Sequence, residues 1–281
     1  MQLLLFSKFF PEKNFEELIE IAKDLGLDGY DLAIRPDNVV NPDNVGDALP
    51  EAVKAFAGAG LSIPMVSGDF DLLEPDHPTA EPILTAMAKA GVSSLKLGYW
   101  TFKPLEDDYW VKVDQIRDCL AGWQELAKQY QVQVCYHTHS GNCMGMNAGM
   151  LMHLLRGFDP RYIAAYLDPA HLLLEGESFL SALSMVGDHL SLIGAKDVLL
   201  TRNQQNGHGG QQISWVEAGH GMVDWRAVFD GLRQVNFDGP ISLHCQFTVA
   251  DNEFIRAVKR DVAFYRSMID TRSSGSNRHV G

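Results

Sequence analysis

The sequence predicts one α/β domain folded as a (β/α)₈ barrel. Along the 281-residue chain, eight short runs rich in apolar and β-branched residues alternate with amphipathic helical stretches, a pattern typical of βαβ units and a parallel sheet. Hydrophobic residues make up 46% of the chain, enough for one large core, and barrels of about 250 residues usually form a single domain. No Gly-rich G-x-G-x-x-G turn follows the first run, so a closed barrel is favoured over an open, doubly wound sheet.

The expected strands are short and apolar, as in a parallel sheet that is buried on both faces. The first begins without a basic segment before it, and Lys8 soon interrupts the apolar run, so we interpret it as a strand and not as a signal peptide. The expected strands are residues 2–6, 28–33, 61–66, 93–98, 132–137, 163–168, 190–196 and 240–245.

The stretches between the strands show the period of amphipathic helices. The first helix has a cap at Asn14 with Glu17 three residues later, and Gly26 ends it. We expect the tryptophans on the apolar helix faces to lie in the core. The expected faces are Phe15, Leu18, Ile19, Ala22 and Leu25; then Trp110, Val113, Ile116, Leu120, Trp123 and Ala127; then Trp225, Val228, Phe229, Leu232 and Val235; and finally Phe254, Val258, Val262, Tyr265 and Ile269.

Two polar segments interrupt or follow this pattern. Residues 201–212 are rich in Gln, Asn and Gly and are interpreted as a mobile loop after the seventh strand, either a lid or a plain surface loop. Residues 273–281 are rich in Ser, Gly and Asn, so we expect a disordered tail. The predicted barrel domain therefore comprises residues 1–272.

Charge and cysteine usage limit the partners that the protein can have. The formal net charge of -13 opposes binding to nucleic acid, because such binding depends on clustered Lys and Arg. The four cysteines show no C-x-x-C spacing, which fits reduced thiols, so we expect a cytoplasmic protein. No apolar run reaches the roughly 18 residues that a membrane span needs, so no membrane partner is expected.

Several expected strands end in polar side chains, which matters because barrel enzymes build their active sites at the carboxyl ends of strands. Alternation along strand five would put His137 and His139 on the same inward side. The relevant side chains are His137, His139, Asp168, His171, Lys196, Asp197 and His244.

His137, Asp168 and His244 are the expected metal ligands. Two neutral imidazoles and one carboxylate on three strand ends can bind a divalent transition metal and leave positions open for water or substrate. The simpler alternative is that each histidine only forms hydrogen bonds at the barrel rim.

The chain resembles the xylose isomerase-like TIM barrels, a superfamily of sugar isomerases and epimerases, inosose dehydratases and apurinic-site endonucleases. The resemblance extends over nearly the whole chain and depends on the order and spacing of several motifs. These are Asp28-Gly29-Tyr30-Asp31, Asp168-x-x-His171, Lys196-Asp197, Gly219-His220-Gly221 followed by Asp224-Trp225, and Phe237-Asp238-Gly239.

The resemblance implies a metal site but also reveals departures from the family pattern. The family typically binds its metal through Glu, Asp, His and Glu on strands five to eight, and the matching positions here are His137, Asp168, Gly194 and His244. Replacing carboxylates by imidazoles favours Zn, Mn, Fe, Co or Ni over Mg as the divalent metal. Gly194 offers no side-chain ligand.

A metal-bound imidazole cannot easily serve as a base as well, so another proton carrier is needed. The candidate catalytic residues are His171, Lys196 and His139. Lys196 has a second interpretation as a Schiff-base lysine, whereas an ion pair with a neighbouring carboxylate is the simpler one.

The expected substrate-binding side chains follow other strands. Asp31, near the end of strand two, lies where the family often places a Glu beside the substrate and would accept a hydrogen bond from a hydroxyl group. Lys96 lies near the end of strand four, and Trp100 follows that strand. Aromatic rings there can stack on the apolar face of a sugar ring.

These observations predict a metal-dependent enzyme that isomerises or epimerises a small keto-sugar or related polyol. A dehydratase, that is, a lyase acting on a keto-sugar or keto-inositol, is the second interpretation, and a metal-free sugar-binding barrel is the third. A DNA-repair endonuclease ranks last because of the negative charge. The family resemblance leaves a homo-oligomer open.

Overall fold

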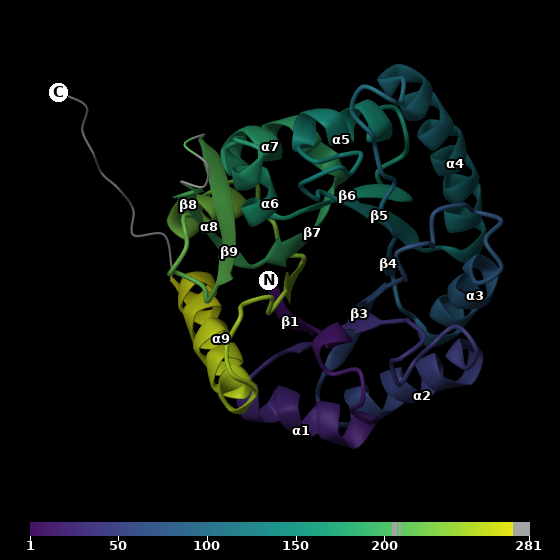
Figure 1. Cartoon of the computed structure of the whole chain (residues 1–281). Coiled ribbons are helices and arrows are strands. Elements are labelled where there is room, and N and C mark those ends of the chain that lie inside the picture. Colours follow the sequence, from purple (N-terminus) through teal and green to yellow (C-terminus); the bar gives the residue numbers. More distant parts are fainter. Residues whose placement is uncertain (204–206, 208, 272–281) are drawn as a thin grey trace.

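The predicted barrel is confirmed by a computed structural model, which describes residues 1–203, 207 and 209–271. Within these residues eight parallel strands close in the order β1-β10-β7-β6-β5-β4-β3-β2, with helices around the outside (Figure 1). The barrel strands are β1 Gln2–Phe6, β2 Gly29–Ala33, β3 Ser62–Ser67, β4 Ser94–Lys96, β5 Gln133–His137, β6 Ile163–Leu167, β7 Leu190–Ala195 and β10 Pro240–Leu243. All eight coincide with expected strands.

The helices cover the outer face of the barrel, as expected for repeated βα units. None of the described helices combines the length and the apolar character that crossing a bilayer requires. They are α1 Phe15–Leu25, α2 Val45–Gly58, α3 Ala80–Ala90, α4 Tyr109–Tyr130, α5 Ala148–Leu155, α6 Pro169–Leu174, α7 Phe179–Val186, α8 Trp225–Gln234 and α9 Phe254–Asp270.

Helix α1 begins and ends where its sequence predicts. The Asn14 side chain accepts a hydrogen bond from the Glu17 backbone N–H, and the Glu17 carboxylate accepts one from the Asn14 backbone N–H, which is a complete capping box. Gly26 ends the helix in the left-handed conformation at a φ of 72°, which glycine adopts without steric cost.

Helix α4 confirms one apolar face and corrects one residue on it. The positions from Val113 to Ala127 that share this face are buried, but Trp110 is 60% exposed. Trp110 lies in the first turn of the helix and packs beside Tyr109 and His153. The helical period assigns it the right face, but the first turn is not covered by the barrel core.

A β-hairpin replaces most of the loop expected at residues 201–212. Strand β8 (Asp197–Asn203) pairs with β9 (Gly210–Val216) in antiparallel fashion, with Thr201 opposite Gln212. The polar composition marks exposure to solvent and not a lack of structure, because a two-stranded hairpin satisfies its backbone without burying its side chains. Residues 204–206 and 208 lie outside the described residues, as do position 272 and the expected tail at 273–281.

The interior of the barrel is filled with side chains and is not a channel. A compact apolar cluster, separate from the core between the strands and helices, consists of Leu4, Met65, Cys135, Ala164, Tyr166 and Leu192. Such layers of inward-pointing side chains are usual in this architecture. This cluster fills the barrel below the polar side chains at the carboxyl ends of the strands.

Candidate functional site

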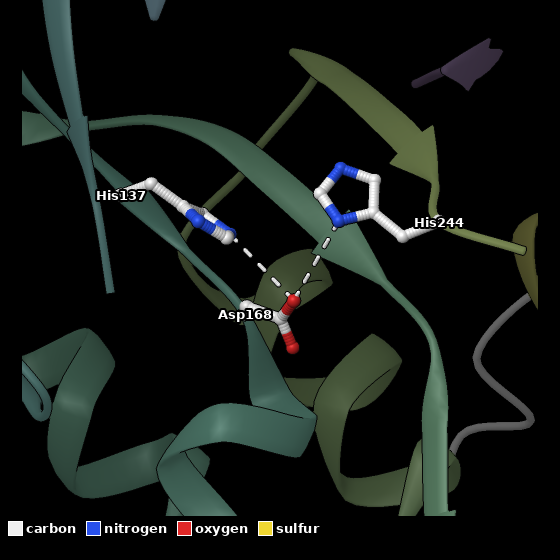
Figure 2. Close-up of side chains that lie close together, drawn as sticks. All are labelled: His137, Asp168 and His244. Carbon is white, nitrogen blue, oxygen red and sulfur yellow. Dashed lines mark ion pairs between the residues drawn. The ribbon is translucent and has the colours of Figure 1, made fainter. Parts of the chain in front are cut away.

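Three buried side chains converge at the carboxyl ends of β5, β6 and β10 (Figure 2). Asp168 Oδ2 lies 3.6 Å from His137 Nε2 and 3.9 Å from His244 Nδ1. One ligand atom from each residue lies within 4.8 Å of the other two. The side chains that the sequence nominates as metal ligands therefore face a common point.

Two tyrosines orient the imidazoles. The Tyr99 hydroxyl lies 2.7 Å from His137 Nδ1, and the Tyr166 hydroxyl lies 3.0 Å from His244 Nε2. Each hydroxyl engages the nitrogen that is turned away from Asp168. In metal sites, such outer partners fix the tautomer and the ring orientation of a ligating histidine.

Local structure also fixes Asp168. Its Oδ1 accepts hydrogen bonds from the backbone N–H groups of Ala170 and His171 at the start of α6, and its own N–H donates to Thr138 Oγ1. Its Oδ2 remains free to face the two histidines.

The two facing atoms of His137 and Asp168 form no hydrogen bond within the described part of the chain, although the Lys196 ammonium lies 3.4 Å from Asp168 Oδ2. Among the described residues, neither His137 Nε2 nor Asp168 Oδ2 has a hydrogen bond of acceptable geometry, although both are buried. Unsatisfied buried polar atoms are rare in proteins and call for an explanation such as an ion. The Asp168 oxygen, and the His137 Nε2 in the tautomer whose Nδ1–H donates to Tyr99, have the lone pairs that a divalent cation requires.

Gly194 on β7 leaves space beside these atoms. A β-carbon at this position would lie 3.1 Å from both Asp168 Oδ2 and His137 Nε2. Any larger side chain would fill the space between the ligands. The donor set, the unsatisfied atoms and this space together fit a divalent transition metal with open positions.

The protonation states suit a metal site as well. Burial lowers the pKa of His137 and His244 well below the usual value, and the positive charge of Lys196 lowers both further. Burial alone would raise the pKa of Asp168, but nearby Lys196 and the histidines hold it below its usual value. Neutral imidazoles and an ionised carboxylate are the forms that bind a metal.

Lys196 lies directly beside the three candidate ligands. Its Nζ is 3.4 Å from Asp168 Oδ2, 2.7 Å from His171 Nε2 and 2.6 Å from Gln246 Oε1. It also lies 4.5 Å from the ring centroid of Trp215 on β9. Burial lowers the pKa of Lys196, whereas Asp168 opposes this shift.

The other two candidate catalytic histidines form a stacked pair. The rings of His139 and His171 lie 4.0 Å apart, centroid to centroid. The backbone N–H of Ser140 donates to His171 Nδ1. Burial lowers the pKa of His139 to about 4, so its imidazole is neutral and only weakly basic at neutral pH.

A cavity of about 90 Å³ opens above these residues. His137 and His139 both line it, as strand alternation predicts. The remaining lining residues are Phe6, Lys8, Arg35, Ser67, Phe70, Lys96, Tyr99, Tyr166, Lys196, His244 and Gln246. A larger hollow of about 750 Å³ is lined by residues such as Gln2, Ser94 and Pro240 at the amino ends of the strands, but no imidazole, lysine or arginine lines it.

Comparisons with known proteins agree with this architecture. The sequence matches the family model for xylose isomerase-like TIM barrels over residues 19–267. This chain belongs to that family. The expected resemblance is thereby confirmed.

Individual relatives of this xylose isomerase-like barrel are more distant. An inosose dehydratase from Lacticaseibacillus casei is 26% identical over 164 residues, and the match spans about half of each chain, 54% of this one and 53% of the relative. The 3-keto-D-glucoside 4-epimerase from E. coli has a similar fold, with a TM-score of 0.75, 18% identity and coverage of 95% of this chain and 99% of that one.

Two further solved structures share the fold. D-psicose 3-epimerase from Clostridium cellulolyticum H10 gives a TM-score of 0.71 at 14% identity, covering 96% of this chain and 100% of that one. The probable 3-DHS dehydratase involved in petrobactin synthesis in Bacillus anthracis gives 0.71 at 15% identity, covering 95% and 99%.

Two expected substrate-binding residues do not line the cavity of this family member. Asp31 is fully buried, and its Oδ2 accepts a hydrogen bond from the Ser242 hydroxyl. Trp100 packs on Tyr136, with 5.0 Å between ring centroids. The third, Lys96, does line the cavity.

The Lys196-Asp197 motif separates into a residue that faces the site and a structural residue. The Asp197 carboxylate accepts hydrogen bonds from the backbone N–H groups of Gly219, Gly221 and Val223 and from the Trp225 indole N–H. It therefore organises the loop before α8. The Gly219-His220-Gly221 motif is explained by this role.

Sequence reasoning misses several residues of the site. The sequence analysis does not predict Tyr166 or Gln246. Tyr166 lies two residues before Asp168, and Gln246 lies two residues after His244, so strand alternation points each pair to the same side. Trp215 lies in the hairpin, whose strands were not expected. Strand parity was the available signal for the first two, while contacts from the hairpin need the tertiary structure.

Proposed function

We propose that this protein is a metal-dependent sugar isomerase or epimerase that moves a proton beside the carbonyl group of a small keto-sugar or related polyol. The observation that carries this proposal is the convergence of His137, Asp168 and His244, with two buried atoms unsatisfied, directly beside Lys196. The epimerases and dehydratases among its relatives and structural neighbours support a sugar-like substrate.

The three converging side chains would hold the metal. A divalent Zn, Mn, Fe, Co or Ni ion at this position would polarise the substrate carbonyl and so make the neighbouring carbon–hydrogen bond more acidic. The tyrosine partners of the two imidazoles keep the ligand nitrogens directed at the ion. The space above Gly194 is open for a substrate oxygen.

Lys196 is the residue best placed to move the proton. It lines the cavity, and burial lowers the pKa of its ammonium group, which makes proton exchange with a substrate easier. Gln246 and His171 hold its Nζ at hydrogen-bond distance. His171 does not itself line the cavity, so we assign it a positioning role.

His139 lines the cavity but is a weaker base. Its pKa of about 4 leaves the imidazole neutral, which suits a hydrogen-bond contact with substrate better than proton abstraction.

A dehydratase is the alternative within the same site. The inosose dehydratase match and the fold shared with a probable 3-DHS dehydratase favour it. Removal of the same proton leads to loss of water when a hydroxyl group lies one carbon further on. A metal-free sugar-binding barrel is the third reading, favoured by the Lys196 ammonium 3.4 Å from Asp168 Oδ2.

Reactions in D₂O distinguish these readings. Metal-supplemented protein is incubated with a panel of keto-sugars, keto-inositols and keto-acids, and the products are followed by NMR and mass spectrometry. We expect deuterium to enter beside the carbonyl with an isomer or epimer as product, whereas a dehydratase would yield a product lighter by one water. Lys196→Gln should slow exchange by about 10² to 10⁴-fold while the metal stays bound.

The absence of exchange and of any product across the panel, with metal bound, would contradict the proposed reaction. Retention of wild-type exchange in Lys196→Gln would instead remove Lys196 from the proton-moving role.

A further inference from the structure

Three cationic side chains gather on one side of the cavity. Lys8 follows β1, Arg35 follows β2 and Lys96 ends β4, and all three line the same cavity as the candidate metal ligands His137 and His244. The chain as a whole carries a net charge of -13. A local concentration of positive charge in an acidic protein needs a specific cause.

These cations have few close acidic partners. The buried Asp31 carboxylate opposes the lowering of the pKa of all three, but it forms an ion pair with none of them. Lys96 is 3% exposed and forms neither an ion pair nor a hydrogen bond with any residue that the structure describes. Lys8 likewise forms no ion pair with a described residue. The nearest carboxylate oxygen to Arg35 is Asp69 Oδ1, 3.9 Å from its Nε, and that Nε has no hydrogen bond.

Aromatic rings surround these side chains in place of carboxylates. Lys96 Nζ lies 3.9 Å from the ring centroid of Tyr99, and Arg35 Cζ lies 4.4 Å from that of Phe70. Lys8 Nζ lies 4.9 Å from that of Phe9. Cation–π contacts hold the charged groups in position. Arg35 donates one long hydrogen bond of 3.5 Å from Nη2 to the Gly68 carbonyl, while its Nε has no hydrogen bond.

A buried cation without a counter-charge destabilises a folded protein. Burial lowers the pKa of Lys8 to about 8 and that of Lys96 well below the usual value. Such a group persists where a ligand supplies the missing negative charge, because the ligand then gains strong charge-assisted hydrogen bonds.

We propose that Lys8, Arg35 and Lys96 bind an anionic group of the substrate, a carboxylate or a phosphate, so that the substrate is a small keto-hydroxy acid or a sugar phosphate. This inference rests on the proposed function, whose substrate class it narrows. It also assigns Lys8 and Arg35 to substrate binding.

The arrangement of the cavity supports a substrate with two distinct ends. The cations come from the β1, β2 and β4 side, and the candidate metal ligands from β5, β6 and β10. The anionic end would lie on the first side and the carbonyl end on the second.

The test is calorimetric binding to the full-length, metal-supplemented protein. The probes are 2-keto-D-gluconate for a carboxylate, D-fructose 6-phosphate for a phosphate and D-fructose as the neutral sugar. We expect one of the two anions to bind at least about tenfold more tightly than fructose. Which anion does so identifies the group. Equal affinity for all three, or a preference for fructose, overturns the inference.

Two variants and one matched control attribute the preference to these residues. Lys96→Met and Lys8→Gln should each reduce the preference for the anion by about tenfold or more, while Lys103→Met, which removes an exposed lysine, should leave it unchanged. An unchanged preference in both cavity variants contradicts the proposal.

Thermal unfolding supplies a readout that a structural role would not produce. Lys96 is a buried cation without an ion-pair or hydrogen-bond partner among the described residues. Lys96→Met should therefore keep or raise the melting temperature while weakening anion binding. A lowered melting temperature with unchanged anion preference indicates a structural lysine and overturns the inference.

The inference and the proposed function can fail separately. If the protein catalyses deuterium exchange in a neutral keto-sugar and shows no preference for anions, only the inference is contradicted. If anions bind tightly through Lys96 but the protein binds no metal and catalyses no deuterium exchange, the proposed function is contradicted and the protein is an anion-binding barrel.

Discussion

At the scale of single residues, two tyrosine hydroxyls decide which nitrogen of each imidazole faces the cavity. Tyr99 engages His137 and Tyr166 engages His244, each at the nitrogen turned away from Asp168. The facing nitrogens are therefore held in place before any ligand arrives. This arrangement costs no reorganisation when an ion enters.

Removing either hydroxyl should weaken metal binding. We expect Tyr99→Phe and Tyr166→Phe to reduce affinity for Zn²⁺ by about 10 to 100-fold, because the imidazoles lose their orienting partners. Competition titration against a chromophoric chelator measures this. Tyr30→Phe is the matched control, since the Tyr30 hydroxyl bonds the Leu18 carbonyl far from the site. Equal losses in all three variants would point to a general loss of stability.

Gly194 provides the second prediction at this scale. Its missing side chain leaves the space where a β-carbon would approach Asp168 Oδ2 and His137 Nε2 to 3.1 Å. Gly194→Ala should therefore lower metal affinity by at least about tenfold while the circular dichroism spectrum stays unchanged. The control is Gly46→Ala on α2, where a β-carbon meets nothing within 4 Å. An affinity equal to the wild type would mean that this space is not used by the ion.

At the scale of elements, the loop between β9 and α8 is held by two buried carboxylates. Asp197 accepts several backbone N–H groups of this loop, and Asp261 on α9 accepts the N–H of Ala218. Burial raises the pKa of Asp261, and the nearby charges of Glu217 and Asp197 add to this shift. The hydrogen bond from Ala218 and the charge of Arg260 oppose it, and the resulting pKa is about 7. The loop is thus fixed from the barrel and from the last helix.

The pKa of Asp261 makes this anchoring depend on pH. Because its folded-state pKa lies above the unfolded value of 3.8, its contribution to stability is fully present below pH 3.8 and is lost as the pH rises through about 7. Asp261→Asn removes this titration and keeps a hydrogen-bond acceptor. Relative to wild type, the variant should gain about 3 kcal/mol between pH 5 and pH 8.5.

Urea unfolding of both proteins at the two pH values checks this prediction. Titration elsewhere contributes equally to both chains and cancels in the comparison. A stability difference that is the same at pH 5 and at pH 8.5 would show that Asp261 does not titrate in this range.

The hairpin of β8 and β9 shows where element prediction from sequence reaches its limit. Short, nearly continuous apolar runs predict the barrel strands because a parallel barrel sheet is buried on both faces. The outer part of the hairpin is exposed and polar, so its sequence resembles a loop. Its exposed polar residues include Thr201, Arg202, Gln211 and Gln212. Its function in the fold is visible only from the contact of Trp215 with Lys196 and His171.

At the scale of the whole molecule, strand order converts separate sequence positions into one site. His137, Asp168 and His244 were predictable as neighbours, because barrel closure places the ends of β5, β6 and β10 around one mouth. The tyrosine partners of the two histidines, and the absence of an ion pair at Lys96 among the described residues, are not predictable from the sequence. They depend on the directions of side chains from different strands. Asp31 shows the same limit, since its place near the end of β2 does not reveal that it is fully buried against Ser242 and does not line the cavity.

The number of metal ions bound by the purified protein tests the central proposal most directly. After removal of metal with a chelator and reloading with Zn²⁺ or Mn²⁺, elemental analysis should find one ion per wild-type chain. His137→Ala and His244→Ala should each lose it, while His189→Ala, whose imidazole bonds the Ile163 carbonyl away from the site, should retain it. A wild-type chain without metal, or equal metal content in all four proteins, would contradict a metal centre at His137, Asp168 and His244.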